Sequence, residues 1–348
     1  MTTAPVNIGF VGAGEQAWES RIPAALALGD LVAVTAIADV DLAKAQGVAD
    51  RFGIRHVHAS AAEMIAGAES RGEPLHGVVS AIPARFAARV GVEVVTAGIP
   101  LLTEKPIADR LAAGETLVRT AHAAGVLLAV GYQMPFGLQE VFGEIEAGSI
   151  GTVRTVDGWW IRPAGIPDRQ SFWDTDRGAG NDLLGHLLSC IVPIVGRPQL
   201  VSGHTTADHG RRRYGDLFRG DDVMTVELVC EGGQLVRLRV AWDDPARAHE
   251  EIGLEVRGSG GAVRLPLPGA ELSGRGRQPI WFDTEGVMRF GAVPLSTDDC
   301  LVAQMRDWVE AIRGEHPLRF TPDLALTAQR IADAAYDSAA AGGRQIEI

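Results

Sequence analysis

The chain of 348 residues is 46% hydrophobic and 22% charged, which is an ordinary composition for a soluble globular protein. Its 32 basic and 44 acidic residues give a net charge of −12, and this argues against nucleic acid or an anionic membrane as the main partner. Because 348 residues exceed what one hydrophobic core usually supports, we expect two domains.

The first part of the chain, from residue 6 to about residue 130, alternates short apolar runs with helical stretches. This alternation is typical of βαβ units in a doubly wound parallel sheet. The pattern predicts five strands there, at residues 6–11, 32–38, 77–81, 100–103 and 127–131.

From about residue 150 the β runs become longer and are joined by short glycine turns, so we expect a largely antiparallel sheet. Strands are predicted at 152–161, 223–230, 234–242 and 252–257, and helices mainly at 180–195, 299–313 and 322–341. The basic triplet Arg211-Arg212-Arg213 lies among glycines and is interpreted as a solvated mobile loop, with a loop over the mouth of a substrate site as the alternative.

A glycine-rich turn, Gly12-Ala13-Gly14-Glu15-Gln16-Ala17, follows the first apolar run. Gly12 permits a tight turn, Gly14 lets the backbone approach a pyrophosphate, and Ala17 is small enough for close packing of helix on strand. The phosphate would then lie at a helix N-terminus, where backbone N–H groups favour negative charge. The competing interpretation, in a chain with 42 glycines, is an ordinary strand-to-helix turn.

Asp39 follows the second apolar run, where its carboxylate can accept hydrogen bonds from both hydroxyls of an adenine ribose. The same charge would repel a 2′-phosphate, so the sequence favours NAD over NADP.

The tripeptide Glu104-Lys105-Pro106 follows a predicted strand directly. Ligands gather at the carboxyl ends of the strands in open parallel sheets, so Lys105 is expected to point toward the nicotinamide of a bound dinucleotide. Taken alone, a lysine at a strand end is usually a solvated charge.

In the order and spacing of its motifs the chain resembles the glucose–fructose oxidoreductase / inositol dehydrogenase family, Gfo/Idh/MocA. The matching segments are the glycine-rich turn, Ser80-Ala81-Ile82-Pro83, Ala97-Gly98-Ile99-Pro100 with Glu104-Lys105-Pro106, Val130-Gly131-Tyr132, the run from Gly178 to His186, and Ala335-Tyr336-Asp337-Ser338-Ala339.

The resemblance implies a Rossmann dinucleotide-binding domain over residues 1–131 and an α/β substrate-binding domain with a large open sheet over residues 132–348. That sheet often forms the subunit interface, so a homodimer or homotetramer is expected. The expected cofactor contacts are Gly12, Gly14, Glu15, Gln16, Ala17, Asp39, Ile82, Pro83, Glu104, Lys105 and Gln133.

The resemblance also implies an Asp-x-x-x-His pair on a helix at the active site, which Asp182 and His186 match. A spacing of four places both side chains on one helical face. Histidine suits proton transfer near neutral pH, so His186 is expected to be the base in oxidation and the acid in reduction. Lys105 would stabilise negative charge on the same oxygen, and Asp182 would bind an adjacent hydroxyl. Without the family, His186 would be interpreted as a core residue.

The resemblance also implies that the part of the chain around the predicted strand 152–161 faces the substrate. Its tryptophans and polar residues then favour a carbohydrate or cyclitol, because tryptophan faces stack on C–H surfaces and polar groups bind hydroxyls. The alternative is a core strand with its following loop. The residues concerned are Trp159, Trp160, Arg162, Arg169, Trp173 and Asp174. The expected substrate contacts are Lys105, Trp160, Arg162, Asp182 and His186.

Three function classes remain open. The leading one is an NAD(H)-dependent oxidoreductase acting on a secondary alcohol or ketone of a sugar, sugar derivative or cyclitol. The second is a non-redox enzyme that cleaves or eliminates a glycosidic bond with tightly bound NAD, and the third is a catalytically inactive nucleotide-sensing regulator.

Other sequence features indicate where the protein works. Cys190, Cys230 and Cys300 are widely separated, so we expect buried free thiols in a reducing compartment. Neither a metal-ligand cluster nor an apolar stretch long enough for a membrane helix is found, and the N-terminus lacks a basic-then-apolar leader, so we expect a cytoplasmic protein without a metal.

Overall fold

The structure is a computed structural model that describes residues 4–163, 165–167, 175, 177–268, 278–292 and 295–348. The chain divides into two compact units, each formed from two segments. The first comprises Met1–Gln133 with Asp298–Leu326, and the second Met134–Thr297 with Thr327–Ile348. The division into residues 1–131 and 132–348 stays a prediction about domains, and in space the segment Asp298–Leu326 packs with the first unit.

The first unit contains a six-stranded parallel sheet in the order β3-β2-β1-β4-β5-β6. The strand order reverses between β1 and β4, which is where open α/β sheets bind ligands. The strands are β1 (Val6–Val11), β2 (Val32–Ala38), β3 (His56–His58), β4 (Gly77–Ser80), β5 (Leu101–Thr103) and β6 (Leu128–Val130). The predicted parallel sheet is therefore confirmed, but β3 makes six strands where five were expected.

Helical segments follow most strands of this sheet. They are η1 (Gln16–Arg21), α1 (Ile22–Leu26), η2 (Gly29–Leu31), α2 (Leu42–Phe52), α3 (Ala61–Ser70), α4 (Ala84–Thr96) and α5 (Leu111–Ala124). Several have clear boundary residues: Asp41 caps α2 by accepting a hydrogen bond from the backbone N–H of Lys44 at 3.1 Å, and Gly53 ends the helix with φ +69°.

A helix from much later in the chain, α10 (Thr297–Ile312), completes the core of the first unit. Its residues Met305, Trp308 and Val309 are fully buried among side chains of β1, α1 and α2. A side chain on Gly77 in β4 would lie 2.6 Å from the Trp308 ring, so this helix packs directly on the sheet.

The second unit is built on a nine-stranded sheet in the order β14-β13-β12-β11-β7-β10-β9-β8-β15. Neighbouring strands pair antiparallel except β7 and β10, which are parallel, so the expected largely antiparallel sheet is confirmed. The strands are β7 (Val153–Ile161), β8 (Pro198–Thr206), β9 (Val223–Cys230), β10 (Leu235–Ala241), β11 (Glu251–Gly258), β12 (Gly261–Pro266), β13 (Ile280–Asp283), β14 (Met288–Phe290) and β15 (Ile346–Glu347).

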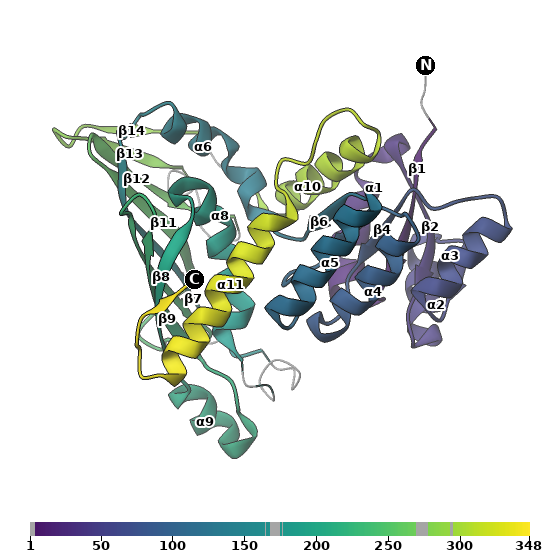
Figure 1. Cartoon of the computed structure of the whole chain (residues 1–348), viewed down its shortest axis with the longest axis horizontal. Coiled ribbons are helices and arrows are strands. Elements are labelled where there is room, and N and C mark those ends of the chain that lie inside the picture. Colours follow the sequence, from purple (N-terminus) through teal and green to yellow (C-terminus); the bar gives the residue numbers. More distant parts are fainter. Residues whose placement is uncertain (1–3, 164, 168–174, 176, 269–277, 293–294) are drawn as a thin grey trace. The chain divides into compact units, whose positions relative to one another are not determined.

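Helices of the second unit gather on one face of this sheet (Figure 1). A side chain on Gly158 of β7 would meet Ile191 of α8 at 3.2 Å, and one on Gly203 of β8 would meet the Ala335 backbone of α11 at 2.2 Å. The helices concerned are α6 (Gln139–Glu146), which follows η3 (Met134–Leu138), α8 (Gly185–Val195), which follows η4 (Gly180–Leu184), and α11 (Pro322–Ala340).

The basic triplet Arg211–Arg213 lies in a helix, so its interpretation as a loop was wrong. This helix, α9 (Asp208–Tyr214), is followed by η5 (Gly215–Leu217). Its first turn is fixed by Asp222, whose carboxylate accepts hydrogen bonds from the backbone N–H groups of His209 at 2.6 Å and Gly210 at 2.8 Å. The three arginines are exposed.

All three cysteines are free and buried, as expected. Among the described residues, no helix is both long enough and apolar enough to cross a bilayer.

Candidate functional site

The glycine-rich turn lies at the carboxyl end of β1, where the strand order reverses. Gly12 has φ +98° and donates a backbone hydrogen bond to Ala38 at the end of β2 at 2.8 Å. A side chain on Gly12 would lie 2.5 Å from the backbone oxygen of Ala81, so only glycine is accommodated. A side chain on Gly14, by contrast, would meet no protein atom within 4 Å. The turn is therefore tightly held on one side and open beside Gly14.

Asp39 lies immediately after β2 and contacts this turn. One carboxylate oxygen accepts a hydrogen bond from the backbone N–H of Ala13 at 2.7 Å, and the other accepts one from the backbone N–H of Asp41 at 2.9 Å. Each carboxylate oxygen has two acceptor positions, so the group can still accept hydrogen bonds from ribose hydroxyls. The open space beside Gly14 and the partly exposed Asp39 carboxylate fit a dinucleotide.

Other predicted cofactor residues belong to the same unit. Ala17 is fully buried, as close packing of the turn requires, while Glu15 is partly exposed and Gln16 is exposed. Ile82 and Pro83 precede α4 at the carboxyl end of β4, and Gln133 is buried. Their contacts with a cofactor stay predictions.

Glu104 is held by a buried arginine that the sequence reasoning missed. Arg21, at the end of η1, is 1% exposed and forms an ion pair with the Glu104 carboxylate. Its guanidinium also donates to the side-chain oxygen of Gln304 in α10 at 2.7 Å and to the backbone oxygen of Gly131 at 3.2 Å. Glu104 in turn accepts a hydrogen bond from the backbone N–H of Lys105 at 3.2 Å. The predicted role of Glu104 in contacting the cofactor stays a prediction.

Lys105 is partly exposed at the carboxyl end of β5, and its peptide bond to Pro106 is cis. The backbone N–H of Glu104 donates to Ser80 at the end of β4 at 2.9 Å. The segment with Lys105 therefore lies at the same edge of the sheet as the glycine-rich turn and Asp39. In the same unit, burial and then the Glu104 charge raise the pKa of the Tyr132 hydroxyl.

In the second unit, Asp182 and His186 lie on consecutive helical turns, Asp182 in the π-helical turn η4 and His186 at the start of α8. Asp182 is partly exposed, and His186 is buried with 7% of its surface exposed. The four-residue spacing of Asp182 and His186 therefore falls within a helical segment, as the prediction of one shared helical face requires. π-Helical turns occur often at functional sites.

The start of this helix is held by Asp221, a buried carboxylate. It accepts hydrogen bonds from the backbone N–H groups of Gly178 at 2.7 Å and Gly180 at 2.8 Å, and from the Tyr336 hydroxyl at 2.7 Å. Tyr336 also accepts a hydrogen bond from the backbone N–H of Asn181 at 2.9 Å. Burial raises the pKa of the Asp221 carboxyl, although these hydrogen bonds oppose the shift. Asp221 therefore fixes the backbone that carries Asp182.

Three adjacent strand ends bring further side chains to Asp182. Since side chains alternate along a strand, Arg162 and Trp160 of the β7 segment share the sheet face on which Gly158 packs against α8. Trp242 follows β10, which pairs in parallel with β7, and Glu250 precedes β11, which pairs antiparallel with β7. The pairing places these residues beside one another although they are far apart in sequence.

The resulting cluster surrounds the predicted catalytic pair. Trp242 Nε1 donates to Asp182 Oδ2 at 3.0 Å, and Arg162 Nη1 lies 3.7 Å from the same oxygen. Glu250 Oε1 accepts from Trp160 Nε1 at 2.7 Å and from Arg162 Nε at 2.9 Å. The rings of Trp160 and His186 lie 5.4 Å apart between centroids. Trp160, Arg162, Asp182 and His186, which were predicted separately, therefore form one group.

Sequence reasoning missed Trp242, Glu250, Asp221 and Tyr336 as members of this group. Their positions depend on strand register and on contacts across 41 to 155 residues of sequence, for which the sequence alone gives no signal. Arg169, Trp173 and Asp174, which were also considered as substrate contacts, lie outside the described residues.

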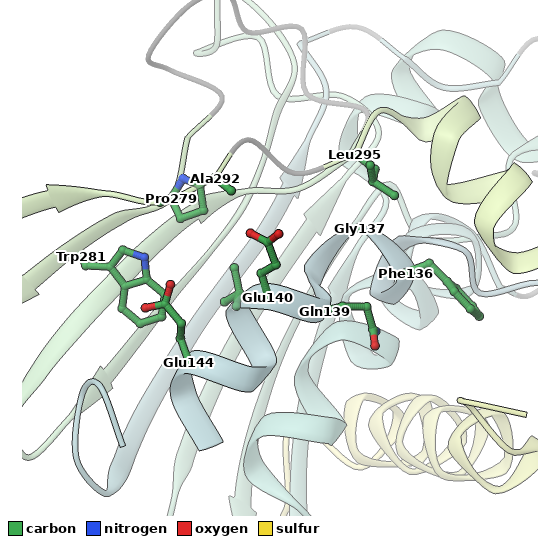
Figure 2. Close-up of a pocket in the computed structure, with 11 residues that line it drawn as sticks. Phe136, Gly137, Gln139, Glu140, Glu144, Pro279, Trp281, Ala292 and Leu295 are labelled. Atoms are coloured by element: carbon green, nitrogen blue, oxygen red, sulfur yellow. The ribbon is translucent and has the colours of Figure 1, made fainter. Parts of the chain in front are cut away.

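A separate cavity of about 210 Å³ lies between α6 and β13 in the second unit (Figure 2). Glu140 and Glu144 of α6 face Trp281 and Pro279 across it, and Leu295 lies at its margin. None of the residues predicted from the sequence lines this cavity.

Fold and site define the class of protein as an NAD-binding oxidoreductase, with a parallel nucleotide-binding sheet followed by a mostly antiparallel sheet. The chain belongs to the Gfo/Idh/MocA family: residues 6–132 match the oxidoreductase family model with an NAD-binding Rossmann fold, and residues 139–264 match the GFO/IDH/MocA C-terminal domain. The family resemblance expected from the motifs is confirmed.

Curated relatives include dehydrogenases of sugars and cyclitols. The chain is 24% identical over 333 residues to D-apiose dehydrogenase of Rhizobium rhizogenes, covering 90% of each chain. It is 26% identical over 289 residues to inositol 2-dehydrogenase of Rubrobacter xylanophilus, covering 82% of this chain and 77% of the relative.

Among solved structures, an oxidoreductase from Agrobacterium radiobacter in complex with NAD⁺, L-tartaric acid and magnesium has the same fold. The TM-score is 0.84 at 20% identity, covering 99% of this chain and 98% of that chain.

Proposed function

We propose that the protein is an NAD(H)-dependent dehydrogenase or reductase that transfers hydride between the nicotinamide and a secondary alcohol or ketone of a sugar, a sugar derivative or a cyclitol. The observation that carries the proposal is the cluster around Asp182 and His186, in which an acid, an imidazole and two tryptophans lie together. Aromatic faces beside hydrogen-bonding groups suit the C–H and O–H surfaces of such substrates. The similarity to D-apiose and inositol dehydrogenases supports this substrate class.

The residues proposed to hold NAD lie in the first unit. Gly12, Gly14, Glu15, Gln16 and Ala17 would surround the pyrophosphate, whose charge the N–H groups at the start of a helix favour. Asp39 would bind the adenine ribose. Contacts to the rest of the dinucleotide would come from Ile82, Pro83, Glu104, Lys105 and Gln133.

When bound, NAD⁺ supplies the hydride acceptor for oxidation of the substrate CH–OH group. His186 takes the hydroxyl proton as the carbonyl forms, and returns a proton to the oxygen in the reverse direction. Lys105 donates a hydrogen bond to that oxygen and stabilises its developing negative charge. Asp182 accepts a hydrogen bond from a neighbouring hydroxyl and so orients the ring. Trp160 and Arg162 contact the substrate beside His186.

The test is NADH absorbance with a panel of inositols, free sugars and glycosides, using NAD and NADP in parallel. We expect a signal with NAD and at least one polyol. The Lys105→Ala variant should lose turnover and still bind NAD. The control variant Lys44→Ala, at an exposed position in α2, should keep both turnover and NAD binding. A protein that releases NAD on denaturation yet forms no NADH with any substrate would instead be a non-redox enzyme, and a protein that binds no dinucleotide would contradict the proposal.

We further propose that the protein acts in the cytoplasm as a homodimer or homotetramer formed through the nine-stranded sheet. The support is the sheet face opposite the helices, where Trp159 is only partly buried and lies under the Arg264 guanidinium, 5.3 Å from its ring centre. Light scattering should show two or four chains, and a monomer at micromolar concentration would contradict this assembly.

A further inference from the structure

The indole of Trp160 packs against the imidazole of His186 and limits where that imidazole can lie. The two ring centroids are 5.4 Å apart, and the ring planes are tilted by 47°. Trp160 is 8% exposed and His186 is 7% exposed, so the rings meet in close-packed surroundings rather than in water. A shift of the indole would therefore open space beside His186 and change the orientation of the imidazole.

Packing alone does not fix the direction in which the indole N–H points. The bond that joins Cβ to a tryptophan ring rotates over a broad range, so the ring can turn when nothing holds its edge. Glu250 holds that edge here, because its Oε1 accepts a hydrogen bond from Trp160 Nε1 at 2.7 Å. Hydrogen bonds to carboxylates are directional and are stronger than those between neutral groups. The Glu250 contact therefore selects one orientation of the indole.

Strand pairing brings Glu250 to the indole. Ile252 of β11 pairs with Trp160 of β7, and Glu250 lies two residues before Ile252. Side chains alternate along a strand, so Glu250 shares the sheet face that carries Trp160 and Arg162. The same Oε1 accepts a hydrogen bond from Arg162 Nε at 2.9 Å, and the Arg162 guanidinium lies over the Trp160 ring, 5.4 Å from its centre. Glu250 is thus fixed at its own end and can hold Trp160 in place.

From these contacts we propose that Glu250 is a positioning residue that holds the Trp160 indole by its N–H and thereby keeps the His186 imidazole in place for proton transfer. The inference deepens the proposed function and rests on it. Proton transfer requires the imidazole to lie within hydrogen-bond reach of the substrate oxygen, and a small displacement lowers the rate strongly. Glu250 takes no proton itself and acts through Trp160.

Glu250→Ala removes the acceptor and tests this in the intact protein, with the polyol that gives the strongest NADH signal. We expect kcat to fall at least about tenfold, because a displaced imidazole transfers a proton less well. Glu250→Gln keeps an oxygen that can accept from Trp160 Nε1, so its kcat should stay within about threefold of wild type. Wild-type kcat in Glu250→Ala, or an equal loss in Glu250→Gln, would overturn the proposal.

Glu251→Ala is the matched control, because it makes the same truncation at the next residue. The Glu251 carboxylate pairs with Arg247 at 3.2 Å and is not part of the group around Trp160. This variant should keep the wild-type kcat. A loss as large as that in Glu250→Ala would show a general effect of truncation at the start of β11 and would contradict the proposal.

A second substitution separates action through Trp160 from action through Arg162. Trp160→Phe keeps an aromatic ring but has no N–H for Glu250 to accept. In the Trp160→Phe background, Glu250→Ala should therefore lower kcat by less than about twofold, because the two changes remove the same contact. A further loss of about tenfold would show that Glu250 acts through Arg162 instead, and would overturn the proposal.

The environment of His186 can be measured without a substrate, which separates this proposal from the proposed function. In protein with isotope-labelled histidine, the ring current of Trp160 shifts the NMR signals of the His186 imidazole C–H groups, which His186→Gln identifies by their loss. At one pH, these signals should move in Glu250→Ala and stay close to wild type in Glu250→Gln and Glu251→Ala.

If NAD binds but no substrate forms NADH, the dehydrogenase assignment fails, while the His186 signals still decide whether Glu250 positions the imidazole. Signals that stay unchanged in Glu250→Ala would contradict the proposal even if the enzyme proves to be a dehydrogenase.

Discussion

Arg21 and Glu104 form an ion pair whose two side chains are 1% and 11% exposed, although they are 83 residues apart in sequence. Arg21 belongs to the helical segment after the glycine-rich turn, and Glu104 precedes Lys105. The pair therefore joins two segments on which the proposed cofactor site depends.

Replacing Arg21 by methionine should destabilise the protein strongly. The change leaves Glu104 buried without its cation and removes the donor to Gln304 and Gly131, so the free energy of unfolding should fall by about 3–5 kcal/mol. Urea unfolding followed by circular dichroism measures it. Arg55→Met, which removes a pair with Glu73 at a position 60% exposed, should change the value by less than about 1 kcal/mol. Similar losses in both variants would contradict the importance of burial.

Two glycines of the same turn should respond differently to alanine. Gly14→Ala adds a methyl group that meets no protein atom within 4 Å, so the unfolding free energy should change by less than about 1 kcal/mol. The affinity for NAD, measured by fluorescence titration, should nevertheless fall at least about tenfold, because the methyl group enters the space assigned to the pyrophosphate.

Gly12→Ala should lose stability as well as affinity, since its φ of +98° and the Ala81 oxygen both oppose a side chain. We expect a loss of about 1–3 kcal/mol. Gly47→Ala, in the exposed part of α2, serves as the control and should lower neither the unfolding free energy nor the affinity for NAD. Unaltered NAD affinity in Gly14→Ala would place the pyrophosphate elsewhere.

Asp221 should give the protein a measurable pH dependence. Because burial raises the pKa of this carboxyl in the folded state, the folded protein binds more protons than the unfolded chain between about pH 4 and the raised pKa. The stability contributed by Asp221 is therefore full below about pH 4 and decreases as the pH rises through this window. Asparagine does not titrate, so the difference in unfolding free energy between wild type and Asp221→Asn should shrink with rising pH.

Chemical denaturation at several pH values measures this difference, with the exposed Asp30→Asn as a control for the loss of one carboxylate. A difference that grows with pH would show that the hydrogen bonds from Gly178, Gly180 and Tyr336 outweigh the effect of burial.

The three thiols should be protected from a disulfide reagent in the native protein. Cys190, Cys230 and Cys300 are buried, and burial raises the pKa of the Cys230 thiol to about 11, so little reactive thiolate forms at pH 8. Ellman's reagent should titrate three thiols in denaturant and react with native protein only as slowly as the protein opens. Rapid reaction of a native thiol would contradict the burial.

Nine of the fifteen strands in the described part of the chain were predicted, because buried strands are apolar runs with clear ends, whereas β8 and β12–β15 were not predicted. β1 and β2 match their predicted ranges, 6–11 and 32–38. β3 was missed because His56–His58 is only three residues long and contains two histidines. The helix α9 was missed because its glycine and arginines are typical of loops, while the carboxylate that caps it, Asp222, comes 13 residues after His209 in the sequence.

The candidate site was predictable where its chemistry is local in sequence. The pair of Asp182 and His186 was predicted from the motif of the family that the chain resembles, and the glycine-rich turn near Gly12 from its own order of glycines. Neither prediction needs knowledge of tertiary structure. Trp242 and Glu250 reach Asp182 and Arg162 only because β10 and β11 pair with β7 in a particular register. No local pattern encodes that register, so these residues could not be found from the sequence.

The return of α10 to the first unit has a consequence for how the chain is made. During synthesis, the six parallel strands leave the ribosome long before Met305, Trp308 and Val309 are made and can cover them. The hydrogen bond from Arg21 to Gln304 likewise cannot form until α10 has been synthesised. We expect nascent chains that end at Gln133 to expose apolar surface and to recruit chaperones. Release should follow only when residues up to Leu326 have emerged, so the nucleotide-binding unit is among the last parts of the protein to become complete.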